Sequence, residues 1–283
     1  MVWTLSVIVP VFLKSLLVPL RLSHLDLEPD HAGRATFAYE AWRPDRLDAL
    51  MDALGEFEAP LSAFVVARSL AEQPEAIARL QKRGVEFHLH SYSHNLAEPD
   101  SAQEIETGMH AFESALGEQP VGYRAPEGRI SEDGLNRLAE RNFLFDSSVF
   151  PSVWPHPRYL HYPRTAYRSQ PSNLLEIPIA TAGRARLLVT LSFIKLLGFP
   201  LYRRLIRQGR VPDPLIFDMH LHDLFVLPAY DQLPALLKVA YSRNRTKGFA
   251  LLRATLTLLR DRGYRFASMT STAKALDQKL PRC

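Results

Sequence analysis

Cysteine is almost absent from this chain of 283 residues, since the single one is Cys283. One cysteine excludes a disulfide within the chain and any metal site built from several thiolates. A bound metal ion must therefore be held by nitrogen and oxygen ligands.

Blocks of like charge are also missing. The chain has 34 Lys and Arg against 30 Asp and Glu, a net charge of +4, and the charges are dispersed. This balance mildly favours an anionic partner or a membrane surface and argues against nucleic-acid binding. With 47% apolar residues and no repeat or low-complexity linker, we expect one globular domain.

An unbroken hydrophobic run of membrane-spanning length is lacking as well. Residues 1–20 are apolar, but a lysine and two prolines interrupt them, and no basic residue precedes them as in a secretory signal. We expect residues 1–34 to be an apolar segment that packs on the main domain or faces a membrane. Residues 35–283 are assigned to that domain, in a cytoplasmic protein with a possible place at the inner membrane surface.

What the chain does contain is an alternation of strand and helix patterns. Strands are predicted at 35–41, 61–67, 121–124, 143–149, 174–180, 215–221 and 264–269, and helices at 44–54, 74–82, 101–117, from 131, and at 248–262. The strands are apolar throughout, as in buried parallel sheets. The sequence therefore predicts an α/β fold with helices outside a parallel sheet.

A polar stretch follows the strand pattern that begins near residue 84. His90 and His94 lie four residues apart in His-Ser-Tyr-Ser-His. If this turn is helical, both imidazoles lie on one face and can hold a single divalent ion. Two histidines at this spacing also occur often by chance, so the flanking motifs decide the interpretation.

With its flanks, the histidine stretch resembles the polysaccharide deacetylase (NodB-homology) family of carbohydrate esterases. In that family a His-Ser/Thr-x-x-His motif supplies two metal ligands. Residues 122–128, Gly-Tyr-Arg-Ala-Pro-Glu-Gly, are similar to the family's Arg-x-Pro motif, and residues 145–148, Phe-Asp-Ser-Ser, to its Asp-Ser-Ser motif. The resemblance implies a distorted (β/α) barrel of about seven parallel strands.

The resemblance further implies the removal of an N-acyl group, acetyl or formyl, from an amino sugar. Glu40 would join His90 and His94 as ligands of one divalent ion. Zinc is expected, and cobalt, iron or nickel would suit the same ligand set. The ion would polarise the carbonyl and activate a water.

Other residues receive roles in the same way. His220 would be the catalytic acid, with His222 as the alternative because both point the same way from a strand. Asp146 would orient the acid, and Arg124 would hold the catalytic base. Pro126 and Glu127 would face the substrate or its oxyanion.

One position departs from the family pattern. In Thr-Phe-Ala-Tyr-Glu, Ala38 stands where the base Asp is expected. Three explanations stay open: an enzyme inactivated by substitution, which we favour because the supporting parts remain, a natural binding protein, or a base supplied by Asp26, Glu28 or Asp30.

The function that fits is a hydrolase of surface-glycan (lipopolysaccharide or exopolysaccharide) biosynthesis, acting on a lipid-linked or nucleotide-linked amino sugar. The alternatives are a non-catalytic carbohydrate-binding pseudoenzyme and a metal-free amidohydrolase. The amphipathic stretch at 186–207 is expected to be a barrel helix rather than a membrane-contacting element.

Overall fold

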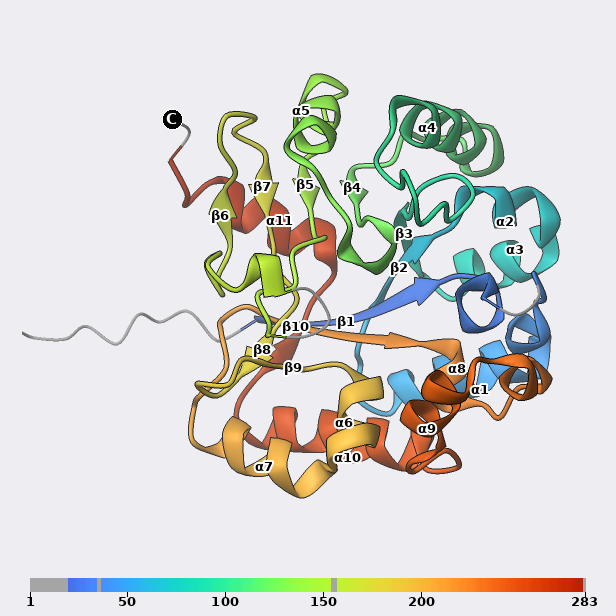
Figure 1. Cartoon of the computed structure of the whole chain (residues 1–283), viewed down its shortest axis with the longest axis vertical. Helices are drawn as coiled ribbons and strands as arrows, with labels where there is room; N and C mark the ends of the chain where they lie inside the picture. Colours follow the sequence, from blue (N-terminus) through green and yellow to red (C-terminus); the bar gives the residue numbers. More distant parts are fainter. Residues whose placement is uncertain (1–19, 35–36, 154–156, 282–283) are drawn as a thin grey trace, which may run out of the picture.

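A curled, mostly parallel sheet with helices packed around it forms the centre of the molecule (Figure 1). The computed structural model describes residues 20–34, 37–153 and 157–281, so the apolar stretch at 1–19 lies outside the described residues. The strands are β1 (Leu20–Leu27), β2 (Leu61–Val65), β3 (Glu86–Leu89), β4 (Gly122–Tyr123), β5 (Phe145–Asp146), β6 (Tyr167–Arg168), β7 (Leu175–Glu176), β8 (Thr181–Ala182), β9 (Leu187–Leu188), β10 (Leu215–His220) and β11 (Arg265–Phe266).

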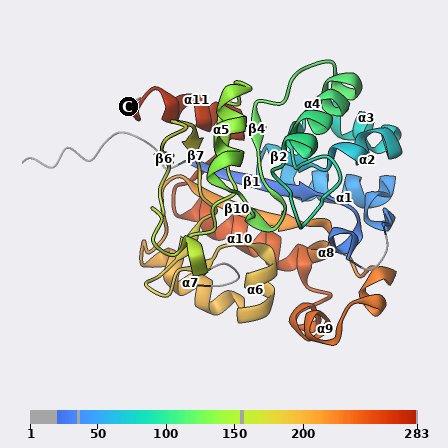
Figure 2. The ribbon, with the colours of Figure 1, turned by 45° about the horizontal axis from the view of Figure 1, so that its top comes forward.

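The helices lie on the outside of this sheet, as a second view shows (Figure 2). They are α1 (Pro44–Gly55), α2 (Ala67–Glu72), α3 (Pro74–Lys82), α4 (Ala102–Leu116), α5 (Glu132–Glu140), α6 (Leu191–Leu197), α7 (Phe199–Arg207), α8 (Leu221–Leu224), α9 (Ala235–Ser242), α10 (Gly248–Asp261) and α11 (Met269–Asp277).

The strand order is β10-β1-β2-β3-β4-β5-β7-β6, with β11 also beside β1 and with β8 and β9 as a separate hairpin. Every pair from β10 to β7 is parallel, and β6 is antiparallel to β7. This confirms the predicted α/β fold and its barrel-like sheet of about seven parallel strands.

The predicted start of the domain at residue 35 is wrong. Strand β1 lies inside the sheet and pairs with β2, β10 and β11. Residues 37–39 have no regular structure, and Glu40–Trp42 form a short 3-10 helix instead of the predicted strand. Leu25 and Leu27 are fully buried, while the polar residues that alternate with them lie at the candidate site. Because the sequence analysis identified interior strands by continuous apolar runs, this alternation of apolar and polar residues hid β1.

Parallel pairing brings the carboxyl ends of several strands to one edge. Asp26 of β1 is in register with His220 of β10, while His90 follows β3 and Arg124 follows β4. Functional groups of βα barrels gather at this edge. The topology thus assembles a candidate site from segments far apart in the sequence.

Serine side chains cap the predicted helices that begin near residues 101 and 131. The Ser101 hydroxyl accepts a hydrogen bond from the Glu104 backbone N–H, and α4 ends at Gly117 with a left-handed φ of 78°. The Ser131 hydroxyl accepts one from the Gly134 N–H at the start of α5.

The stretch at 186–207 packs on the barrel, as expected. It contains α6 and α7, and α7 buries Tyr202 and Ile206. The Tyr202 hydroxyl donates to the Leu188 carbonyl at 2.7 Å. Within the described ranges, no helix combines the length and apolar character that crossing a membrane requires.

Gly248 should be intolerant of a side chain. A Cβ atom there would lie 2.2 Å from the Asp223 carbonyl oxygen and 2.7 Å from the Leu224 Cα, whereas one at Gly55 would meet nothing within 4 Å. We expect Gly248→Ala to lower the free energy of unfolding by about 1–3 kcal/mol through overpacking. Gly55→Ala is the control and should leave it unchanged or raise it. Urea titration measures both, and equal midpoints would contradict the prediction.

Candidate active site

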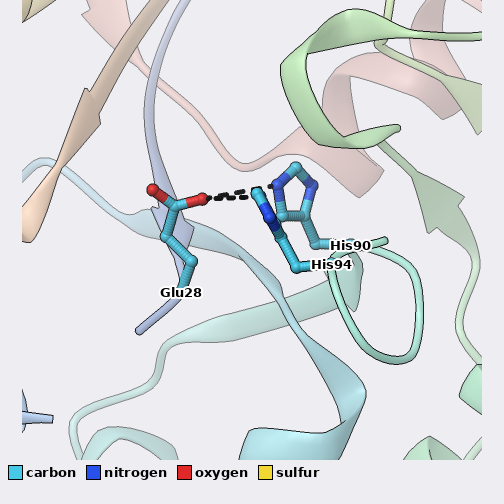
Figure 3. Close-up of side chains that lie close together, drawn as sticks. All are labelled: Glu28, His90 and His94. Carbon is cyan, nitrogen blue, oxygen red and sulfur yellow. Dashed lines mark ion pairs between the residues drawn. The ribbon is translucent and has the colours of Figure 1, made fainter. Parts of the chain in front are cut away.

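A carboxylate and two imidazoles meet at the carboxyl edge of the sheet (Figure 3). The Oε2 atom of Glu28 lies 3.0 Å from Nε2 of His94 and 3.8 Å from Nε2 of His90. The three side chains are buried, and their ligand atoms all lie within 4.8 Å of one another. Ligands at about 2.0–2.1 Å from a tetrahedral ion are separated by about 3.4 Å. The group therefore fits one ion with a position left for another ligand.

The charge states also suit a metal. The Nδ1–H of His90 donates to the Arg124 carbonyl at 2.7 Å, which leaves the lone pair on Nε2, toward Glu28. Burial lowers the pKa of His90 to about 4, so this ring is neutral at pH 7. Burial opposes the charge of Glu28, but the imidazoles around it, His220 first, hold its pKa well below its usual value.

The loop that carries the histidines is not helical, yet it brings both imidazoles to one place. Ser91 and His94 have left-handed φ angles of 57° and 61°. The Glu104 carboxylate fixes the loop, because it accepts hydrogen bonds from the backbone N–H groups of Tyr92 (3.0 Å) and Ser93 (2.8 Å) and from the Ser93 hydroxyl (2.6 Å). A helix N-terminal residue thus holds the two imidazoles in place.

Arg124 lies behind this group and is fully buried. Its Nη1 atom donates to Asp26 and to Asp218, both at 2.7 Å. Its Nε donates to the Ser147 carbonyl at 3.1 Å, and its guanidinium carbon lies 4.0 Å from the centre of the Phe64 ring. Burial and the neighbouring Asp26 charge raise the pKa of Asp218 to about 7. The guanidinium fixes Asp26 beside Glu28.

His220 faces the same two carboxylates from β10. Its Nε2 lies 3.7 Å from Oδ2 of Asp26 and 3.8 Å from Oε1 of Glu28, and its Nδ1 lies 3.7 Å from Oδ2 of Asp223. Burial disfavours the charged imidazole, yet the surrounding carboxylates, Glu28 first, raise the pKa of His220 well above its ordinary value. This histidine holds a proton that it can give to a substrate.

The structure corrects the predicted carboxylates. Glu40 is exposed, and its backbone N–H donates to the Asp30 carboxylate; Glu28 takes the place beside the histidines that was predicted for Glu40. The carboxylates that Arg124 holds are Asp26 and Asp218, and the Ala38 carbonyl accepts from the Asp30 N–H at 2.8 Å. Of the alternatives for the base, Asp26 is the one that Arg124 holds, so Ala38 marks no missing base.

Asp146 also lies elsewhere than predicted. Its carboxylate accepts from the Ser148 N–H (3.0 Å) and hydroxyl (2.7 Å), and it is hydrogen-bonded to Glu176. The carboxylate at Nδ1 of His220 is Asp223 instead. Asp223 lies three residues after His220, so the two are close in the sequence as well.

Residues of the Arg-x-Pro motif lie at the rim. Pro126 is buried in a 3-10 turn, Pro126–Gly128. Glu127 forms ion pairs with Arg34 and Arg129 and lines a cavity of about 250 Å³ that opens over the site. A substrate or oxyanion role for these two residues stays a prediction.

Two further histidines line this cavity, and sequence reasoning missed them as a pair. His222 was considered only as an alternative acid, and His31 was not considered. The rings of His220 and His222 stack at 4.7 Å, and so do those of His222 and His31. A lone histidine in a turn carries no signal in one sequence.

Asp26 and Glu28 were named as alternatives, yet their placement at a strand end was not predicted. The available signal was the alternation of Leu25 and Leu27 with carboxylates two residues apart. In a strand that alternation sends both carboxylates to one face.

Comparisons with known proteins agree with this architecture. Residues 30–144 match the family model described as polysaccharide deacetylase, which confirms the family resemblance over this stretch. The matched stretch contains His90, His94 and Arg124 but none of the strand-end residues Asp26, Glu28 and His220.

A curated relative is a peptidoglycan deacetylase-like protein of Gibberella zeae, 32% identical over 108 residues. The match covers 37% of this chain and 32% of the relative, so it spans about a third of that protein's length.

Solved structures show the same fold. A candidate polysaccharide deacetylase from Mycobacterium smegmatis superposes with a TM-score of 0.57 at 18% identity, covering 92% of this chain and 93% of its own. A CE4 family pseudoenzyme from Bacillus anthracis superposes with a TM-score of 0.51 at 12% identity, covering 89% of this chain and 65% of its own.

Glu104 should act as a positioning residue for the metal-binding loop. Glu104→Ala removes the acceptor of two backbone N–H groups, so we expect a loss of about 1–3 kcal/mol in unfolding free energy. Affinity for zinc should fall about 10–100-fold, as for other residues that orient ligands. Competition with a chelator measures it.

Glu106→Ala on the same helix is the matched control. Its carboxylate pairs with Arg141 at the surface, so its removal should cost about 0–1 kcal/mol and leave zinc affinity unchanged. Equal zinc affinities in the two variants would show that the loop keeps its shape without Glu104.

Proposed function

We propose that the protein is a metal-dependent hydrolase that removes an N-acyl group, acetyl or formyl, from an amino sugar. One observation carries the proposal. Asp26 is held by Arg124, while Glu28, two residues further on, joins His90 and His94. A base and a metal-ligand set therefore share one edge of the cavity.

A divalent ion would be held by Glu28, His90 and His94, whose donor atoms and neutral His90 ring fit it. Two imidazoles and a carboxylate suit zinc first, and also cobalt, iron or nickel. When bound, such an ion acts as a Lewis acid for a carbonyl and lowers the pKa of water.

Asp26 and His220 divide the proton transfers between them. Asp26 takes a proton from the attacking water, and Arg124 keeps the carboxylate in position. His220 gives its proton to the amide nitrogen as the C–N bond breaks, so the amine leaves neutral. Asp223, on the other side of the ring, orients Nδ1 and leaves Nε2 toward the cavity.

A carbohydrate-binding pseudoenzyme is the second candidate, because a pseudoenzyme shares this fold. The complete set of base, ligands and acid in the described site favours the enzyme. The metal-free amidohydrolase is disfavoured by the ligand set.

Substitutions at two neighbouring positions test the roles. Asp26→Asn should lower deacylation about 10²–10⁴-fold, as for a lost general base, while the zinc content stays near one per chain. Glu28→Ala should lose the zinc and the activity together. Elemental analysis and hydrolysis of N-acetyl and N-formyl amino sugars are measured side by side.

Glu40→Ala is the control, since Glu40 is exposed and should change neither quantity. Loss of zinc in Glu40→Ala with retention in Glu28→Ala would restore the original ligand assignment. Hydrolysis by Asp26→Asn at the parent's rate would remove Asp26 from the mechanism.

We also propose that the amino sugar is lipid-linked, within surface-glycan biosynthesis, and that the enzyme works at the cytoplasmic face of a membrane. Helix α9, at the lower right in Figure 1, buries none of its residues, and Leu236 and Val239 are 81% and 69% exposed. Leu237 and Tyr241 of the same helix line the cavity. The exposed apolar surface therefore continues to the site.

The charge around α9 supports an anionic surface as its partner. Lys238, Arg243, Arg245 and Lys247 lie in this segment, and no acidic residue occurs from 232 to 247. Anionic lipids attract such segments on the cytoplasmic leaflet. A nucleotide-linked sugar would not need the exposed leucine and valine.

The double variant Leu236→Ser, Val239→Ser tests this contact. The parent should sediment with vesicles of phosphatidylglycerol and phosphatidylcholine in equal parts, less so at high salt, and the variant should stay in solution. Leu201→Ser on α7, where Leu201 is 39% exposed, is the control and should bind like the parent. If the parent protein does not sediment with these vesicles, that result would favour the nucleotide-linked substrate.

A further inference from the structure

Three imidazole rings lie in a row along one side of the cavity. The His220 and His222 rings stack with centres 4.7 Å apart and planes 21° apart, and His222 and His31 stack at 4.7 Å and 22°. Tyr241 closes the row, with its ring edge-on to both His31 (5.5 Å) and His222 (5.1 Å). The row runs from the proton donor into the cavity.

The two outer rings bury polar atoms that make no hydrogen bond within the described protein. These atoms are both nitrogens of His31 and the Nε2 of His222. His31 is 4% exposed and His222 is 7% exposed, and both line the cavity. A buried polar atom without a hydrogen-bond partner costs free energy. A phenylalanine ring in the same stack would have no such atom and would avoid this cost.

The backbone of His31 supports a functional reason for this cost. Its φ is 52°, in the left-handed region, within the short 3-10 turn Asp30–Gly33. Residues other than glycine seldom adopt this conformation, although histidine does so more often than most. The turn places the His31 ring on His222 and inside the cavity.

Resting on the proposed function, we propose that His31 and His222 form a subsite that reads hydroxyl groups of the sugar ring whose N-acyl group lies at His220. A neutral imidazole has one N–H donor and one acceptor nitrogen, and a hydroxyl can pair with either. The stacking places the His222 ring next to His220 and the His31 ring one step further along the cavity wall.

Several features agree with hydroxyl groups rather than a charged ligand. Burial lowers the pKa of His31 to about 4 and of His222 to about 3, so both rings are neutral at pH 7. Glu28 and Asp26 line the same cavity and would repel a second anion. A volume of about 250 Å³ is below the usual range for larger ligands and suits a single sugar unit.

The experiment uses His31→Phe and His222→Phe, which keep the ring stack and remove the nitrogens. Binding of the methyl glycosides of N-acetylglucosamine, N-acetylgalactosamine and N-acetylmannosamine, and of their monodeoxy analogues, is measured by calorimetry with the zinc-loaded full chain. Each variant should weaken binding of at least one parent glycoside tenfold or more. Zinc content and melting temperature are measured alongside.

The diagnostic result is coupling between a ring and a hydroxyl. The deoxy analogue that lacks the recognised hydroxyl should bind the parent protein tenfold more weakly and should lose nothing further in the matching variant. His110→Phe, a substitution of an exposed histidine on α4, is the control and should bind every glycoside like the parent.

Each outcome bears separately on the subsite and on the hydrolase. Coupling without hydrolysis of any amide would support the subsite and count against the deacylase. If amides are hydrolysed but the losses in binding from the ring substitution and from the missing hydroxyl simply add, the subsite would be overturned and the deacylase supported. Failure of the whole glycoside panel to bind would overturn the subsite as well.

Discussion

The guanidinium of Arg124 has no access to solvent, and the site depends on how its charge is satisfied. A buried cation is stable only when its hydrogen bonds and counter-charges are complete. Asp26 of β1, Asp218 of β10 and the Ser147 carbonyl after β5 supply them from three other segments. The same arginine's carbonyl accepts from His90 and orients that ring. One residue thus couples the proposed base, a proposed metal ligand and the strands that carry them.

The sequence predicted those features of the fold and the site that depend on local motifs, and it missed those that depend on pairing between distant segments. His90, His94, Arg124 and His220 follow apolar strands within recognisable local motifs, and the structure brings them to one edge. The helices with Ser caps were equally local. The prediction of the carboxylates was wrong because the Thr-Phe sequence at 36–37 matched the family pattern better than strand β1 did. Glu40 was therefore chosen over Glu28. Only strand pairing with β10 reveals that β1 is central.

Replacing Ala38 and Glu40 by Asp26 and Glu28 as the site residues changes the class of protein that the site supports. With Ala38 as the base position, the chain would be an inactivated enzyme; with Asp26 held by Arg124, the described site contains a carboxylate for the proposed base. The fold alone does not separate the possibilities, because it is shared by a pseudoenzyme. The distinction rests on individual side chains, of which Asp26, Glu28 and His220 lie outside the stretch that the family model matches.

The pairing of β1 also bears on how the protein folds and tolerates shortening. This strand lies near the start of the described chain, yet two of the strands that pair with it, β10 and β11, come from the last third of the sequence. Contacts so distant in sequence form slowly. Until these contacts form, Arg124 can pair with Asp26 but not with Asp218. The backbone N–H and C=O groups along that edge of β1 also stay unpaired, and they can pair with strands of other chains. A ribosome-bound or truncated chain ending before residue 215 would therefore need protection from aggregation, although it would already contain both histidines of the proposed metal site.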